Sequence, residues 1–516
     1  MSMKVESVKK YWFLATFACV FLVMASVWLG GLNQDEGWYL YAANLVAEGK
    51  MLYRDFFYTQ GPLLPIIYSP FKFIWEMFGL VGARVFTSLW GVAGIVVAMF
   101  IASSLVSEDK SRSAKLMVFV LLACNLYHIY YVTIPKTYAL AAFFVALGYW
   151  FYSRAFTITN IKIRYLIFAL SAALLAFASG ARISLGLLLP VCGLILLLGF
   201  KRLRWSFLFF GIGGIVGLLA VYGVFLCDID ALQGLIAAQK YHTSRGGFSP
   251  VLIVGSLSRL VRWYLPIFII AGLAIVGGGF KNCFKTASFA VRSSVLAMLG
   301  GVFSVILLQL FSPCPYDDYQ VPLMGLLCVA SVIGFKYSDI SLSPVKAIWL
   351  VIGLSFAGSF GSPLLEDWSS DGQDRFWTLK KEKSEIALLR DVAHEIEKLD
   401  PGGDTLFTQD LYLAIETGRK VPQGLEMGPF SILSNSRWRD MLLTTDCPVA
   451  ALSGYSFAID PPVCNERNIE EQIEFWNILK SRYNVVDQVN RFGQNSTTLL
   501  LLKLADNIEL KESQKR

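Results

Sequence analysis

The chain has 516 residues, of which 55% are hydrophobic and only 16% are charged, and its mean hydropathy is +0.55. Soluble domains carry about 25% charged residues, so this composition excludes a disordered chain and an ordinary cytosolic globular enzyme. Residues 1–361 contain 27 Lys and Arg against 13 Asp and Glu, whereas residues 362–516 contain 18 against 25. The positive excess therefore lies in the apolar part, where Lys and Arg set membrane topology, and it indicates no nucleic-acid partner.

Eleven stretches without charged residues are long enough to cross a membrane, which takes roughly 17 to 25 predominantly apolar residues. They are residues 11–32, 85–107, 116–135, 137–153, 165–181, 183–200, 205–227, 263–280, 293–316, 319–335 and 347–365. The first stretch is too long for a signal peptide and lacks a small-residue cleavage site, so we expect a retained helix there. The sequence thus predicts an α-helical polytopic membrane protein with eleven transmembrane helices.

Lys and Arg in the short loops predict the orientation of these helices. If the N-terminus is cytoplasmic, 17 of them fall in short inner segments, and fewer fall in the outer segments, which are longer in total. An odd number of spans then places the tail outside, which in a bacterium is the periplasm. We therefore expect a transmembrane domain over residues 1–365, with outer loops at 33–82 and 228–262, and a periplasmic domain over residues 366–516.

The first outer loop begins with the acidic pair Asp35 and Glu36. Asn33 followed by Glu36 has the spacing of a capping box, and Gly49 is a suitable helix end. The apolar residues that share one face of the expected helix are Trp38, Tyr41, Ala42 and Leu45. This pattern predicts an amphipathic helix on the outer surface of the membrane. The acidic pair either completes the cap and the helix dipole or takes part in a reactive site.

Further charged and aromatic residues occur at the outer ends of the predicted spans. The cations are Lys136, Arg182, Lys240 and Arg245, which either snorkel to the interface or bind an anion. Asp55 follows Arg54 and is either an acid of the site or half of a surface ion pair. Tyr316 and Tyr319 flank two aspartates before the tenth span, as in an interfacial aromatic belt.

The tail has a soluble pattern. Strands are expected at 404–409, 448–454, 483–489 and 497–504, and helices at 383–398, 410–417 and 468–481, which together predict a small α/β domain. Cys447 and Cys464 both lie in the tail, where an oxidising periplasm permits a disulfide, and the sequence leaves this pairing open. With three His in the chain and no CxxC or HExxH motif, a dedicated zinc site has no sequence support.

The run Asp35–Ala42, continued by Tyr53–Phe57 and Gly61–Leu63, resembles the first outer loop of bacterial glycosyltransferases of the GT-C fold. These are relatives of the family 39 protein mannosyltransferases and of the lipid A aminoarabinose transferase. Further similarity lies in Pro315–Tyr319, and in the tail in Leu413–Pro422 and Gly428–Phe430. The resemblance covers nearly the whole chain, and the first outer loop is its most specific part.

The resemblance implies that a sugar passes, with inversion, from a polyprenyl-phosphate donor to an envelope acceptor, which is a lipid, a glycan or a protein, at the outer face of the inner membrane. Asp35 would be the catalytic acid or base, with Glu36 and Asp55 beside it. For such a reaction, the substrate-binding candidates at the outer membrane face are Lys136, Arg182, Lys240, Arg245, Tyr316 and Tyr319. The sugar, the acceptor and the metal dependence stay open, although carboxylates of this loop are suitable ligands for a divalent cation.

One departure from the family bears on the sugar. Where the aminoarabinose transferase has a Glu-Lys-Pro-Pro stretch, this chain has Thr59-Gln60-Gly61-Pro62, so that enzyme's second acid and its phosphate-facing Lys have no counterpart here. The resemblance therefore does not indicate aminoarabinose as the sugar, and Asp55 is the nearest substitute acid.

Two other functions remain as alternatives. A transporter or flippase of lipid-linked sugars is expected to have ionisable residues at mid-bilayer or paired inverted repeats, whereas the charges here lie at the span ends. A membrane-anchored scaffold for sensing or assembly would explain the tail but not the acidic first loop. The sequence therefore favours the glycosyltransferase.

Overall fold

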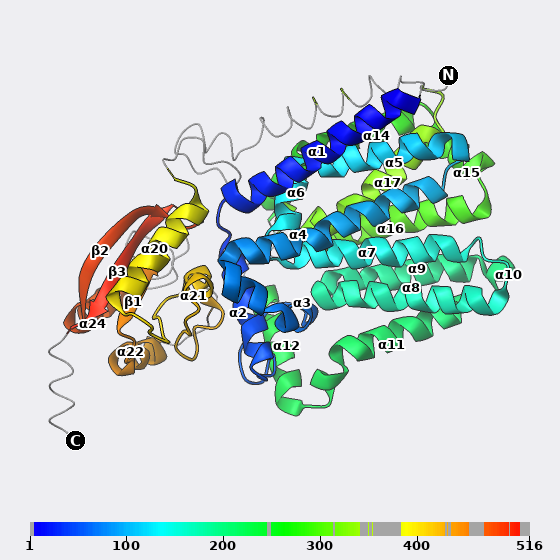
Figure 1. Ribbon diagram of the computed structural model, residues 1–516. Helices are drawn as coiled ribbons and strands as arrows, with labels where there is room; N and C mark the ends of the chain where they lie inside the picture. The colour runs from blue at the N-terminus through cyan, green and yellow to red at the C-terminus, as the bar shows by residue number, and fades with distance from the viewer. Residues whose placement is uncertain are drawn as a thin grey trace. The chain divides into compact units, whose positions relative to one another are not determined.

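The computed structural model describes residues 5–244, 249–312, 315–340, 349, 353, 383–428, 431, 435–453, 469–494 and 496–505, and within these ranges it is mostly helical (Figure 1). The chain divides into two compact units. The first, called here the helical unit, comprises Met1–Ser26, Thr59–Leu64 and Val85–Glu366. The second, called here the tail unit, comprises Val27–Tyr58, Pro65–Arg84 and Asp367–Arg516. Part of the first outer loop thus belongs to the same unit as the C-terminal tail.

The helical unit is built from apolar helices that pack against one another, some of which continue into the tail unit. Its helices, and those that extend from it, are α1 (Val5–Leu29), α3 (Leu63–Tyr68), α4 (Phe73–Ser104), α5 (Glu108–Ala123), α6 (Leu126–Thr133), α7 (Thr137–Ala155), α8 (Ile161–Ala181), α9 (Leu188–Leu198), α10 (Phe200–Leu203), α11 (Ser206–Leu226), α12 (Ile229–Ser244), α13 (Pro250–Trp263), α14 (Leu265–Val276), α15 (Gly279–Thr286), α16 (Phe289–Leu310) and α17 (Val321–Lys336). Short 3₁₀ turns η2 (Ile183–Leu187) and η3 (Asp317–Gln320) precede α9 and α17.

Six helices of the described ranges are long and apolar enough to cross a membrane, or up to eight if two bent pairs each form one span. The bent pairs are α5 with α6, at 72°, and α13 with α14, at 86°. The predicted stretch at 183–200 is a shorter apolar helix, and the stretch at 347–365 lies almost wholly outside the described residues. The polytopic helical fold is thus confirmed, but eleven long unbroken helices are not.

The reason for one break lies in a polar side chain inside an apolar run. Asn125 ends α5 and caps α6, because its side-chain oxygen accepts a hydrogen bond from the backbone of His128 at 2.9 Å. Its amide nitrogen donates to the carbonyl of Trp263 at 2.9 Å, where the second bent pair changes direction. The two breaks are therefore joined by one side chain, and a charge-free run in the sequence need not be one continuous helix.

Small residues allow two of the spans to approach closely. On α11, a Cβ at Gly213 or Gly217 would lie 2.5 or 2.8 Å from the Cα of Ala169 or Ala173 on α8. Small residues at helix contacts are typical of membrane bundles, where association depends on close van der Waals packing.

The tail contains the expected small α/β domain. Its helices and strands are α20 (Glu385–Leu399), α21 (Leu411–Thr417), α22 (Asn435–Thr444), α24 (Ile469–Arg482), β1 (Val449–Ser453), β2 (Tyr483–Phe492) and β3 (Thr497–Leu504). The three strands form an antiparallel sheet in the order β1-β3-β2, and α20 and α24 lie beside it (Figure 1). The predicted strand at 404–409 makes only isolated bridges, one of them from Phe407 to Ala450, and α22 was not predicted.

The tail unit also contains α2 (Gln34–Ala47), the helix expected in the first outer loop. The capping box and the left-handed Gly49 after its end are confirmed, but the prediction of an amphipathic surface helix is wrong. Both faces of α2 are buried, including Glu36, Gly37 and Leu40, which lie away from the predicted apolar stripe. The physical reason is that α21 of the tail packs directly on the backbone of α2 at Gly37.

Candidate functional site

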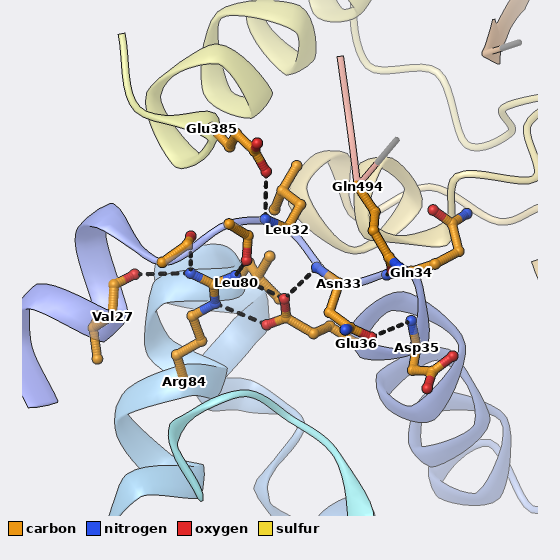
Figure 2. Close-up of polar contacts among 12 residues, drawn as sticks. Val27, Leu32, Asn33, Gln34, Asp35, Glu36, Leu80, Arg84, Glu385 and Gln494 are labelled. Carbon is orange, nitrogen blue, oxygen red and sulfur yellow. Dashed lines mark hydrogen bonds and ion pairs between the residues drawn. The ribbon is translucent and has the colours of Figure 1, made fainter. Parts of the chain in front are cut away.

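The N-terminus of α2 presents the acidic pair of the first outer loop. The side chain of Asn33 accepts a hydrogen bond from the backbone of Asp35 at 3.1 Å, and the Glu36 carboxylate accepts one from the backbone of Asn33 at 2.9 Å (Figure 2). These two bonds are the reciprocal contacts of a capping box. They fix the conformation of the segment from which the Asp35 side chain extends.

The Glu36 carboxylate is also half of a fully buried ion pair with Arg84 of α4. The guanidinium makes two hydrogen bonds to it, from Nη2 to Oε1 at 2.7 Å and from Nε to Oε2 at 2.8 Å, and neither side chain is exposed (Figure 2). Arg84 donates further bonds to the carbonyls of Val27, Gly30 and Gly31 at the end of α1. This one side chain therefore connects the end of α1, the start of α2 and α4 within the tail unit.

The sequence reasoning did not identify Arg84. The sequence contained one signal, a single Arg directly before a long apolar run. If the helix begins before this Arg, the Arg requires a buried partner. In the structure α4 begins at Phe73 and is kinked at Gly79, and Arg84 lies in the helical segment that follows the kink, not in a loop.

Asp35 itself is half-buried, unlike Glu36, and lies in the first turn of α2. The indole nitrogen of Trp38 donates a hydrogen bond to its Oδ1 at 3.1 Å. The Trp38 ring stacks on Tyr39 and contacts the edge of Tyr58, so this donor is fixed by aromatic packing. A carboxylate oriented in this way can accept a proton from a nearby hydroxyl group.

Asp55 has a local structural role. Its carboxylate pairs with Arg54 at 2.9 Å and accepts a bond from the backbone of Met51 at 2.7 Å, which closes a turn. The hydrogen bond from Arg54 is the main reason that the pKa of Asp55 lies below its ordinary value. Asp55 thus forms the surface ion pair that was one of its two interpretations.

The helical unit contains a second polar cluster, formed by residues at the start of α7, the end of α8 and the start of α17. The ammonium group of Lys136 and the hydroxyl of Tyr138 both donate to Oδ2 of Asp318, at 3.0 and 2.8 Å. The guanidinium of Arg182 lies over the rings of Tyr138 and Tyr319, 4.8 and 4.4 Å from their centroids. The predicted residues Lys136, Arg182 and Tyr319 are therefore brought together, and Tyr138 and Asp318 join them.

The other three predicted binding residues are Lys240, Arg245 and Tyr316. Lys240 is exposed on α12, and Arg245 lies outside the described residues. Tyr316 is 52% exposed, and its ring contacts the edge of the Tyr319 ring at 5.5 Å.

The sequence left metal binding and one disulfide open. Within the described parts of the chain, no group of three or more His, Cys, Asp or Glu side chains could hold a metal ion, so Asp35, Glu36 and Asp55 do not form such a group. Cys447 is buried, and Cys464 lies outside the described residues, so their pairing stays open.

Comparison with solved structures identifies the fold. The chain is similar to the crystal structure of ArnT from Cupriavidus metallidurans bound to undecaprenyl phosphate, with a TM-score of 0.61 and 12% identity over 96% of this chain and 98% of that one. Against the apo state of the same protein the TM-score is again 0.61, with 13% identity and the same coverage. No family model and no curated protein sequence matches the chain. The chain therefore has the polytopic GT-C fold that the sequence resemblance implied.

Proposed function

We propose that this protein is an integral-membrane glycosyltransferase of the inner membrane, which moves a sugar from a polyprenyl-phosphate donor to an envelope acceptor at the outer face. The observation that carries this proposal is the likeness in fold, over nearly the full length of both chains, to an ArnT structure bound to undecaprenyl phosphate. That lipid is the product that remains when a sugar leaves a donor of the proposed class. Asp35 of the tail unit and Arg182 of the helical unit are of the residue types that such a reaction requires.

In this proposal Asp35 is the catalytic base. The acceptor oxygen attacks the anomeric carbon, the bond from that carbon to the phosphate oxygen breaks, and the hydroxyl proton passes to the Asp35 carboxylate. The phosphate oxygen leaves with the electron pair of the broken bond, so polyprenyl phosphate departs as an anion. The half-buried position of Asp35 and its orientation by Trp38 support this role, because a base must be fixed within hydrogen-bond reach of the proton that it accepts.

Arg182 is the proposed ligand of the donor phosphate. Tyr138 and Tyr319 contact its guanidinium over their faces, which restricts its rotation, and the N–H groups of a guanidinium point outward in its own plane. A planar fork of this kind suits the oxygens of a phosphate. The charge of Lys136 is balanced by its ion pair with Asp318, so this proposal assigns the phosphate to Arg182.

The base is tested with purified protein in lipid vesicles that contain a labelled polyprenyl-phosphate sugar and an envelope extract as acceptor. Asp35→Asn keeps the shape of the side chain but removes the base, so we expect transfer to fall by about 10²- to 10⁴-fold. The control is Asp391→Asn on α20, an exposed carboxylate paired with Lys383, which should transfer at the wild-type rate. Wild-type protein that moves the lipid-linked sugar across the bilayer without forming a new glycosidic bond would support the flippase instead.

The phosphate contact is tested by donor dependence in the same assay. Arg182→Ala should weaken donor use tenfold or more, because loss of a charge-assisted contact costs about 1.5 to 3 kcal/mol, and Arg182→Lys should recover only part of it. Arg154→Ala, an exposed arginine at the far end of α7, is the matched control. Unchanged donor dependence in Arg182→Ala would assign Arg182 a structural role at the membrane interface.

A further inference from the structure

Four consecutive backbone amides before and at the start of α2 each have a side-chain acceptor. Figure 2 shows that the amides of Asn33 and Asp35 are bonded within the capping box, whereas those on either side of Asn33 are bonded to the tail. The Leu32 amide donates to the carboxylate of Glu385, and the Gln34 amide donates to the side chain of Gln494 at 2.8 Å. The tail therefore supplies every second acceptor along the segment that leads to Asp35.

These amides require such partners. The first N–H groups of a helix, and those just before it, have no carbonyl of the preceding turn to bond with. Leu32 and Gln34 are buried, and an unpaired buried amide is costly, so acceptors from elsewhere in the fold stabilise one conformation of the segment. Because alternate amides are fixed from different sides, the backbone before Asp35 has little freedom to rotate.

The two acceptors come from a helix and a hairpin turn of the tail. Glu385 is buried at the start of α20, and Gln494 lies in the turn between β2 and β3. The Gln34 side chain makes a third connection, from its Nε2 to Oδ1 of Asp410 at 3.2 Å. Asp410 is itself buried, and this burial raises the pKa of its carboxyl group above the ordinary value.

We propose that Glu385 and Gln494 are positioning residues for Asp35, so that the C-terminal domain takes part in the reaction by fixing the direction of the Asp35 carboxylate. This inference rests on the proposed role of Asp35 as the base. It extends that role, because residues of the tail would hold the backbone that carries Asp35. Neither side chain is proposed to contact the reacting atoms. A small displacement of a catalytic group is enough to cost on the order of 10²-fold in rate. Contacts that hold the backbone before Asp35 would therefore preserve the rate of transfer.

The test compares Gln494→Ala and Glu385→Ala with wild type in the transfer assay, with kcat and the donor KM measured separately. Loss of either acceptor should lower kcat by on the order of 10- to 100-fold and leave the donor KM unchanged. Glu385→Gln keeps an acceptor oxygen and should recover most of the rate. The matched control is Gln488→Ala, the same residue type at an exposed position of the same hairpin. Gln494 lies in a turn outside the core, so its variant is expected to unfold at the wild-type temperature.

A double variant separates positioning from general stability. If Gln494 acts through Asp35, then Gln494→Ala should cause no further loss of kcat in an Asp35→Asn background, whereas an independent structural effect would lower the rate equally in both backgrounds. Full kcat in Gln494→Ala and Glu385→Ala, or equal losses in the two backgrounds, would overturn the positioning role. If Asp35→Asn is inactive while both tail variants are fully active, only this inference fails. An Asp35→Asn protein with the wild-type rate overturns the proposed base and the positioning role together.

Discussion

Arg84 is the residue on which the start of α2 most depends. Its guanidinium and the Glu36 carboxylate are both inaccessible to solvent, and removing one partner of such a pair leaves an uncompensated buried charge, at a cost of about 3 to 5 kcal/mol. We therefore expect Arg84→Leu to lower the unfolding temperature of the detergent-solubilised protein clearly. The measurement is thermal unfolding followed by tryptophan fluorescence.

Two comparisons make this prediction specific. The double variant Glu36→Gln with Arg84→Leu should be less destabilised than Arg84→Leu alone, because no buried carboxylate is then left without its cation. Lys72→Ala removes an exposed pair with Glu76 and should change the free energy of unfolding by less than about 1 kcal/mol. Wild-type stability of Arg84→Leu would mean that Glu36 is neutralised or solvated in another way.

At the scale of single residues, the sequence revealed local partners but not distant ones. The spacing of Asn33 and Glu36 was enough to predict the capping box, because both partners belong to one turn of helix. The pairing of Arg84 with Glu36 spans 48 residues, and that of Lys136 with Asp318 spans 182. No local pattern contains that information, so the sequence predicted that Lys136 snorkels to the interface or binds an anion, whereas the structure places it in a buried ion pair.

At the scale of elements, the packing of α2 against α21 depends on one glycine, Gly37. A Cβ at position 37 would lie 2.6 Å from the Leu411 carbonyl carbon and closer still to the backbone nitrogen of Tyr412, neither of which can rotate away as a side chain could. We expect Gly37→Ala to separate the two helices and to lower the free energy of unfolding by about 1 to 3 kcal/mol or more. Limited proteolysis of the tail and thermal unfolding measure this change.

A glycine with open space provides the control. Gly223 on α11 has no atom within 4 Å of the position that a Cβ would take, so Gly223→Ala should be neutral or slightly stabilising, as alanine favours a helix interior. Equal unfolding temperatures for Gly37→Ala and wild type would show that α2 and α21 can move apart without loss of stability.

The same contact explains why the environment of α2 was predicted wrongly. Trp38, Tyr41, Ala42 and Leu45 do share one face, and a helix with one apolar face is normally half exposed. Hydrophobic periodicity predicts burial only for a helix face that carries apolar side chains. At Gly37, on the flank of that face, the helix is covered by the backbone of α21, and a glycine gives no hydrophobic signal for such a contact.

At the scale of the whole molecule, the order of apolar segments and the α/β character of the tail followed from the sequence. Every predicted stretch up to residue 335 contains a helix, and three of the four predicted strands are present. Two features did not follow: the breaks inside apolar runs, and the grouping of Val27–Tyr58 with the tail. Both depend on hydrogen bonds between residues far apart in the chain, such as Asn125 with Trp263 and Leu32 with Glu385.

This grouping has a consequence for topology. The amides of Leu32 and Gln34 are hydrogen-bonded to Glu385 and Gln494, so the first outer loop and the tail must lie on the same side of the membrane. An even number of crossings therefore separates them, which agrees with the ten spans that the sequence predicts between these segments.

Reporter fusions test both the parity and the absolute orientation. Fusions after residue 50 and after residue 505 should report the same side, and the excess of Lys and Arg in the opposite loops predicts that this side is the periplasm. A fusion after Lys110, in an inner loop, should report the cytoplasm and serves as the internal control. Opposite sides for residues 50 and 505 would contradict the hydrogen bonds between loop and tail, and with them the positioning role of Glu385 and Gln494. The same side for both, but in the cytoplasm, would leave those bonds intact and exclude a reaction at the outer face, because the loop that carries Asp35 would then face the wrong compartment.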